Sequence, residues 1–167
     1  PMILAGLGIF LSIIGIYAVK TKEEASQKEL LKALGKGINL SSILILITSS
    51  VVIKYMLPQN FGVWGSIVTG LIAGVIIGKG TEYYTSSNYS PTKGIAGQAK
   101  TGPATVIIDG IATGMMSTII PVITISSAIL LSYAFAGGFS NISLGLYGIA
   151  IAAVGMLSTL GLTLATD

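Results

Sequence analysis

The sequence predicts an all-α integral membrane protein with about five transmembrane helices. Hydrophobic residues make up 52% of the chain and charged residues only 9%, whereas a typical soluble domain has about 25% charged residues. Mean hydropathy is +0.87, and long apolar runs alternate with short polar segments. Because a charge costs several kcal/mol at the centre of a bilayer, this composition is typical of an integral membrane protein.

Apolar runs of about 18 or more residues predict the membrane helices. The predicted spans are residues 2–19, 40–57, 63–79, 103–136 and 142–166, all within one transmembrane domain. The fourth run is longer than a hydrocarbon core of about 30 Å requires, so it must tilt, kink at Pro121 or protrude from the membrane. Because the chain begins with Pro1 and not with Met, we expect it to be a stretch of a longer protein.

Polar segments at residues 20–39 and 80–102 join the spans on one side, and tight turns at 58–62 and 137–141 join them on the other. In the first polar segment, Thr21 and Glu24 have the spacing of a capping box at a helix start, and Gly35 and Gly37 predict the end of that helix. We expect either a short amphipathic helix on the membrane surface or a solvated connector.

Lysine positions predict the orientation. Eight of the nine lysines lie in or beside the two longer polar segments, and the exception, Lys54, is close enough to a helix end to reach the headgroups. By the positive-inside rule, residues 20–39 and 80–102 are cytoplasmic, Asp167 reaches the cytoplasmic face, and the N-terminus is outside. Tyrosines and Trp64 near the predicted span ends agree with an aromatic belt.

The composition excludes several kinds of chemistry. The chain has no Cys and no His, so it offers no thiolate or imidazole for catalysis or for zinc. The pI near 9.2 is explained by lysines that flank membrane spans. We predict no nucleic-acid binding, because no basic patch with interleaved aromatic residues is present.

Asp109 is the only charged residue predicted to lie well inside a span. Thr105, Asp109, Thr113 and Ser117 follow one another at i,i+4 spacing and form a polar stripe. A carboxylate within the membrane that faces other helices is a candidate for ion movement. The alternative is that Asp109 lies near the interface and is solvated from the cytoplasm. In the last span, Thr159, Thr163 and Thr166 form a similar stripe, which fits helix packing as well as an ion path.

Two glycine-containing patterns have different meanings. Gly70, Gly74 and Gly78 repeat the small-xxx-small spacing that lets helices approach closely, which indicates packing and no particular function. The segment from Gly78 to Ser86 places Lys79 and Glu82 at a membrane boundary, where Glu82 is a candidate to hold a cation or relay a proton, or is simply an anchor. The segment is not a phosphate-binding loop, because its glycine spacing is wrong and no Thr directly follows the Lys.

The string Thr81-Glu82-Tyr83-Tyr84-Thr85-Ser86 resembles the membrane-integral pyrophosphatases. The resemblance continues in register through Tyr89, Pro91, Ile95-Ala96, Thr101-Gly102, Ala104-Thr105, Gly110, Gly114-Met115, Ser117-Thr118, Pro121 and Gly155-Met156-Leu157-Ser158-Thr159. It is close over roughly residues 60–167, while residues 1–59 agree only in hydropathy.

The resemblance implies a central fragment of an ion pump with about sixteen transmembrane helices that works as a homodimer. Such pumps couple Mg²⁺-dependent hydrolysis of cytoplasmic pyrophosphate to export of H⁺ or Na⁺, and some also need K⁺. It implies that the catalytic and Mg²⁺-binding motifs lie outside this stretch, so we expect no catalytic residue here and no pyrophosphate hydrolysis by this stretch alone. Metal ligands are not identified.

The resemblance supports Glu82 and Asp167 as candidates for ion movement or coupling, because Glu82 matches the family's motif Glu and Asp167 matches an acidic residue just before a motif that would lie beyond this stretch. It does not support Asp109, where many members have a small or apolar residue. The alternative functions are a secondary transporter without hydrolytic activity and a non-catalytic bundle of membrane helices.

Overall fold

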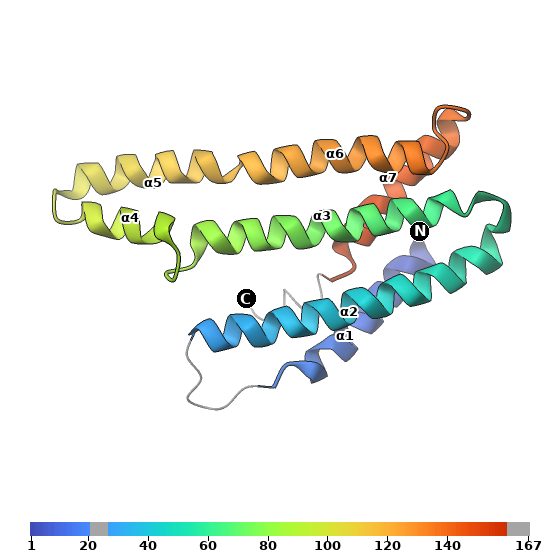
Figure 1. Ribbon diagram of the computed structural model, residues 1–167, viewed down its shortest axis with the longest axis horizontal. Helices are drawn as coiled ribbons and strands as arrows, with labels where there is room; N and C mark the ends of the chain where they lie inside the picture. The colour runs from blue at the N-terminus through green and yellow to red at the C-terminus, as the bar shows by residue number, and fades with distance from the viewer. Residues whose placement is uncertain (21–26, 160–167) are drawn as a thin grey trace. The chain divides into compact units, whose positions relative to one another are not determined.

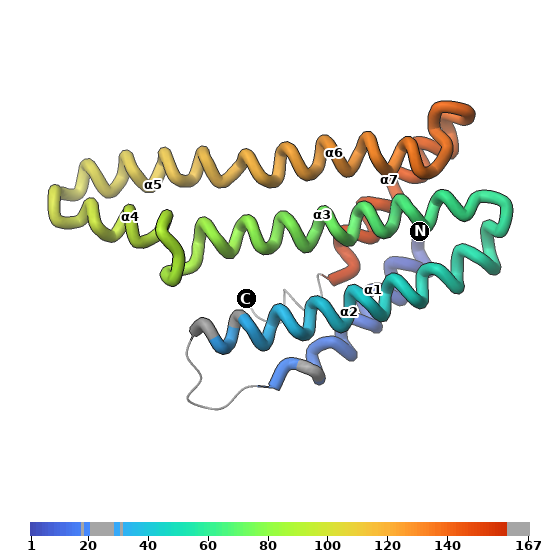
Figure 2. Tube along the Cα trace, viewed as in Figure 1, coloured from blue at the N-terminus to red at the C-terminus, as the bar shows by residue number. Residues whose placement is uncertain are grey.

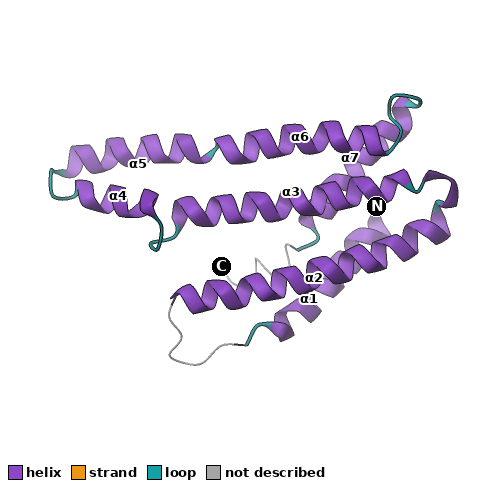
Figure 3. Cartoon of the chain, viewed as in Figure 1, coloured by secondary structure: helices purple, strands orange, loops and turns teal. Residues whose placement is uncertain are grey.

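The computed structural model describes residues 1–20 and 27–159, and all the regular structure in these ranges is helical (Figures 1 and 3). The α-helices are α1 (Met2–Ala18), α2 (Gln27–Met56), α3 (Gly62–Thr85), α4 (Ser90–Gln98), α5 (Pro103–Ser117), α6 (Ile119–Phe135) and α7 (Ile142–Leu157). A 3-10 turn, η1 (Pro58–Asn60), lies between α2 and α3. The prediction of an all-α protein is confirmed.

Three helical stretches within the described residues are long and apolar enough to cross a membrane: Lys32–Met56, Gly62–Gln98 and Pro103–Phe135. Met2–Tyr17 and Ile142–Leu157 are shorter apolar helices. These five stretches correspond in order to the five predicted spans.

The predicted stop at Gly35 and Gly37 is wrong, because α2 is one continuous helix through both glycines. The reason is packing against α1. Gly37 is buried, and a methyl group on Gly15 would lie 3.2 Å from the Gly37 carbonyl oxygen and 2.9 Å from Ser41 Oγ. These small residues therefore let two helices approach closely, which outweighs the roughly 1 kcal/mol that a glycine costs inside a helix. Thr21 and Glu24 of the proposed capping box lie outside the described residues.

The third helix also continues past its predicted end at Lys79 and finishes at Thr85. Polar residues in this extension bond to their own helix. Thr81 Oγ1 donates to the Ile77 carbonyl and Thr85 Oγ1 donates to the Thr81 carbonyl, both at 2.9 Å. Much of the second predicted polar segment is therefore helical, as the end of α3 and the whole of α4.

The long fourth run is interrupted at Thr118, between α5 and α6. Pro121 has no N–H to donate to the carbonyl of Ser117, so the regular hydrogen-bond ladder is broken just before the proline. The hydroxyls of Ser117 and Thr118 donate to the carbonyls of Gly114 and Met115, both at 2.7 Å. The helix is thus interrupted three residues before Pro121, the residue at which a kink was one of the expected outcomes.

The two predicted tight turns are confirmed. Residues 58–62 contain the 3-10 turn, and residues 137–141 include Gly137 with a φ of 82°, a backbone conformation that favours glycine. The Asn141 side chain then caps α7 by accepting hydrogen bonds from the N–H groups of Ser143 at 3.0 Å and Leu144 at 3.4 Å. Within the described residues α7 ends at Leu157, and Thr163, Thr166 and Asp167 lie beyond them.

The chain divides into two compact units. The first comprises Pro1–Gly74 with Ala128–Asp167, and the second comprises Val75–Ser127. The first unit has a buried apolar core, made by Ile53, Val63, Ile67, Ala136 and Ile151. Leu4, Leu57, Trp64 and Tyr147 pack against this core.

Close helix contacts in the first unit are made by small residues. A methyl group on Gly70 of α3 would overlap the Ala152 carbonyl of α7, and one on Gly74 would lie 3.0 Å from the Met156 carbonyl oxygen. Gly78, the third member of the predicted small-xxx-small series, has open space around it. The packing interpretation is therefore confirmed for Gly70 and Gly74, whereas at Gly78 it stays a prediction, because no described helix of this chain contacts that position.

Buried serines serve the same close packing. Ser12, Ser41, Ser49 and Ser132 each donate to a carbonyl three or four residues earlier in their own helix. Ser66 of α3 donates across to the Ser132 carbonyl of α6 at 2.8 Å. A small hydroxyl that is satisfied in this way is compatible with an apolar interior.

The second unit contains the end of α3, all of α4 and α5, and the start of α6. Figure 2 shows the chain leaving α3, turning, and entering the short α4 before it reverses into α5. The reversal occurs at Gly102, whose φ is 144°, and Thr105 Oγ1 donates to the carbonyls of Gly102 at 2.7 Å and Gln98 at 3.2 Å. On the opposite side of the unit, Gly80 of α3 packs against the side chain of Ile120 of α6.

Candidate functional site

Glu82 lies in the last turn of α3, where the structure makes it half-buried. The carbonyl of Glu82 accepts a hydrogen bond from the N–H of Ser86 at 2.9 Å, and α3 ends at Thr85. The last turn of a helix has about half a unit of negative charge and leaves carbonyl groups without helical donors. A carboxylate and this negative helix end together favour a cation close to Glu82.

Residues 86–89 form a corner between α3 and α4, which we call the α3–α4 corner. Ser86 is buried, and its Oγ accepts hydrogen bonds from the Asn88 backbone N–H at 3.3 Å and from Asn88 Nδ2 at 3.5 Å. The Tyr83 ring packs against Tyr84 in an edge-on arrangement, with centroids 5.2 Å apart, and against Tyr89 at 5.3 Å. The corner is thus an ordered interruption of an apolar helical stretch.

Such an interruption has a known chemical use. Discontinuous membrane helices present free carbonyls and the negative ends of helix dipoles, which coordinate cations in transporters. Glu82 is located one turn before the α3–α4 corner, so it combines a carboxylate with the negative end of a helix at the predicted membrane boundary. This location is the main structural support for Glu82 as a candidate.

Asp109 lies on the half-buried side of α5, together with Thr105, Thr113 and Ser117 of the predicted polar stripe. A methyl group on Gly94 of α4 would lie 3.9 Å from Asp109 Oδ2, so this carboxylate faces α4. The apolar residues Ile107, Ile108, Ile111 and Met115 form the opposite face of α5 and are 61–69% exposed. The stripe predicted from the i,i+4 spacing therefore lies on the half-buried side of α5, and its Asp109 faces α4.

Glu82 and Asp109 belong to the same compact unit but to different helix pairs. Gly80 faces Ile120, and two residues further along a helix the side chain points about 200° away, so Glu82 projects away from α6. Asp109 lies beside α4. No cluster of three or more His, Cys, Asp or Glu side chains suited to a metal occurs in the described part of the chain. These residues alone do not fit a Mg²⁺ site, and Asp167 lies outside the described ranges.

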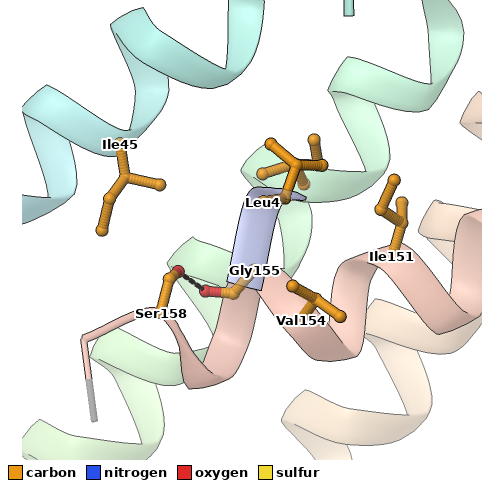
Figure 4. A pocket seen from close by; sticks show the side chains of 7 residues that line it. Leu4, Ile45, Ile151, Val154, Gly155 and Ser158 are labelled. Carbon is orange, nitrogen blue, oxygen red and sulfur yellow. Dashed lines mark hydrogen bonds between the residues drawn. The ribbon is translucent and has the colours of Figure 1, made fainter. Parts of the chain in front are cut away.

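A small cavity in the first unit is apolar and separate from the candidate residues. It is lined by Leu4, Ile45, Ile67, Ile151, Val154, Gly155 and Ser158, and Figure 4 shows six of these labelled around it. Its one hydroxyl, that of Ser158, donates to the Gly155 carbonyl, which leaves no polar group free to orient a ligand. We interpret this cavity as a gap in helix packing.

Sequence reasoning missed the α3–α4 corner, because residues 80–102 read as one polar segment. A local signal was present. Pro91 follows Asn88, Tyr89 and Ser90, and a proline in the first helical turn after such residues is typical of a helix start. The hydrogen bond from Thr92 Oγ1 to the Tyr84 carbonyl, at 3.2 Å, joins residues eight positions apart and has no signature of its own in the sequence.

Comparison with known proteins gives a consistent result. A relative from Bacteroides thetaiotaomicron, named for K⁺-stimulated, pyrophosphate-energized sodium pumping, is 54% identical over 171 residues that cover 100% of this chain and 23% of the relative. A Clostridium tetani protein with the same kind of name is 46% identical, covering 100% of this chain and 24% of that protein. A Methanosarcina mazei protein named as a K⁺-insensitive pyrophosphate-energized proton pump is 38% identical, covering 100% of this chain and 24% of that protein.

The chain therefore spans about a quarter of the length of these relatives. The family model described as inorganic H⁺ pyrophosphatase matches residues 1–167, which is the whole chain. The resemblance first seen between residues 60 and 167 thus extends through the N-terminal helices as well. This chain belongs to the inorganic H⁺ pyrophosphatase family.

Proposed function

We propose that this chain is one membrane-embedded stretch of a pump that couples pyrophosphate hydrolysis to ion transport. The observation that supports this most strongly is the family match over the whole chain, combined with apolar helices long enough to span a bilayer. Because the chain spans only about a quarter of its relatives, hydrolysis belongs to the full-length protein. We expect that activity to need Mg²⁺ bound by residues elsewhere in the protein.

Sodium is the transported ion that we propose. The relatives that are 54% and 46% identical are named for sodium pumping, whereas three relatives named as proton pumps are 38–42% identical. The same two names include K⁺ stimulation, so we propose that K⁺ increases the activity of the full-length protein.

We propose Glu82 as the residue of this chain that contributes most to ion movement or coupling. The support is its position in the last turn of α3, next to the α3–α4 corner. Asp167 is a second candidate, because it matches an acidic residue just before a family motif, and Asp109 is a weaker one. The lysine distribution supports a cytoplasmic location for residues 20–39, 80–102 and Asp167, with the N-terminus outside. We also propose that the full-length protein is a homodimer.

The test uses inverted membrane vesicles that contain the full-length protein. We expect pyrophosphate with Mg²⁺ and K⁺ to cause phosphate release and uptake of radioactive Na⁺. Absence of phosphate release in the presence of both Na⁺ and K⁺ would eliminate the pump. Phosphate release with acidification of the vesicle lumen, but without Na⁺ uptake, would identify H⁺ as the ion instead.

A further inference from the structure

The end of α3 needs hydrogen-bond donors from outside the helix. The last four carbonyls of a helix have no helical partner, and an end without donors frays. In a helix that continued, the Tyr84 carbonyl would bond to the N–H of Asn88. Here the Asn88 N–H donates to Ser86 Oγ instead, at 3.3 Å.

Thr92 supplies the missing donor for Tyr84. Its Oγ1, on the first turn of α4, donates to the Tyr84 carbonyl at 3.2 Å, and the Thr92 side chain is half-buried. The hydroxyls of Thr81 and Thr85 in the same region donate to carbonyls of their own helix. The Thr92 bond therefore differs from its neighbours, because it joins the end of α3 to the next helix.

The other end of α4 is joined to α5. Thr105 Oγ1 donates to the Gln98 carbonyl at 3.2 Å, and Gly94 lies against the carboxylate of Asp109. The helix α4 is thus held to α3 at its start and to α5 at its middle and end.

We propose that Thr92 is a positioning residue for Glu82, acting through its hydrogen bond to the Tyr84 carbonyl. This inference depends on the proposed coupling role of Glu82. Loss of the bond frees the carbonyl two residues after Glu82 and loosens the last turn of α3. The carboxylate then samples several positions, so ion transport loses efficiency while pyrophosphate hydrolysis continues.

The test compares the full-length protein with its Thr92→Val, Thr92→Ser, Thr69→Val and Glu82→Gln variants in vesicles. Valine keeps the shape of threonine without the hydroxyl, and serine keeps the hydroxyl. Thr69 is the matched control, because it is half-buried in α3 and its Oγ1 donates to the Gly65 carbonyl of the same helix at 2.9 Å. The measured quantity is the number of ions transported per phosphate released, together with amide exchange at Ser86.

We expect Thr92→Val to lower the transport ratio about fivefold and to speed Ser86 exchange by a similar factor, as loss of one hydrogen bond allows. Thr92→Ser brings the transport ratio and the Ser86 exchange rate to within about twofold of the unmodified protein. Thr69→Val leaves both quantities unchanged. Equal loss of hydrolysis and transport in Thr92→Val, or no rescue by serine, would overturn the positioning role. If Glu82→Gln lowers the ratio and Thr92→Val does not, only the positioning proposal fails. If Glu82→Gln leaves the ratio unchanged, the coupling role of Glu82 fails and the role of Thr92 fails with it.

Discussion

Single glycines in α3 differ in what surrounds them, although the sequence places them in one regular series. Gly70 lies directly against the backbone of α7, whereas Gly78 faces open space in its unit. The spacing predicts both as contact positions, but only the packing partner decides which of them needs to lack a side chain. Comparing alanine substitutions at these two positions therefore measures how much the contact between α3 and α7 at Gly70 contributes to stability.

We expect Gly70→Ala to destabilise the protein by about 1–3 kcal/mol, because its methyl group would overlap the Ala152 carbonyl. Gly78→Ala replaces a helical glycine at a position that no other part of this chain contacts, so we expect a gain of about 0.5–1 kcal/mol. Heat-induced loss of the folded full-length protein in detergent measures both. Equal destabilisation by the two variants would contradict the assignment of Gly70 to the helix contact.

Asn141 provides a second prediction at this scale. Its side chain accepts hydrogen bonds from two N–H groups at the start of α7. We therefore expect Asn141→Ala to lower the stability of that helix end by about 1 kcal/mol. Amide exchange at Ser143 and Leu144 should accelerate about fivefold. Asn141→Asp is the control, since a carboxylate is an equally good N-cap and should leave exchange unchanged.

At the scale of the elements, the sequence predicts where helices exist better than where they end. All five apolar runs contain helices, and both tight turns are correct. The errors occur where side-chain hydroxyls or glycines serve packing. Thr81 and Thr85 look like the start of a polar loop, yet each satisfies its hydroxyl on its own helix backbone. Such bonds make polar residues compatible with a helix, and no simple hydropathy pattern records them.

The interruption between α5 and α6 gives an element-scale prediction. Pro121→Ala restores an N–H that can donate to the Ser117 carbonyl, so we expect one continuous helix across Thr118. Amide exchange of residues 118–122 should slow by about tenfold. Pro103→Ala is the matched control, because a proline in the first helical turn removes no helical bond and its replacement should have no such effect. Unchanged exchange in Pro121→Ala would show that another feature causes the break.

At the scale of the whole molecule, the distribution of lysines predicts which loops face the cytoplasm. The chain has no Cys, so single cysteines placed on it report their own accessibility once any cysteines elsewhere in the full-length protein are replaced. In sealed right-side-out cells, a membrane-impermeant maleimide should label Asn60→Cys and Ser140→Cys. It should label Lys93→Cys and Lys100→Cys only after the membrane is opened. The reverse pattern would invert the predicted topology.

The candidate site was predictable from sequence in part. The motif around Glu82 identified the residue, and the i,i+4 spacing predicted the stripe that includes Asp109. The placement of Glu82 in the last turn of a helix, and the bond from Thr92 that completes this turn, depend on contacts between residues several positions apart. Such contacts follow from how α4 packs on its neighbours, which a pattern within one helix does not contain.

We propose that this chain is part of a pyrophosphate-driven pump whose transport step depends on Glu82. The most direct test measures Na⁺ uptake and phosphate release together, in vesicles containing the full-length protein or its Glu82→Gln variant. We predict pyrophosphate-driven uptake in the unmodified protein, and at least a tenfold lower ratio of ions to phosphate in Glu82→Gln, because the amide cannot provide the negative charge that attracts a cation. An unchanged ratio in Glu82→Gln would contradict the claim.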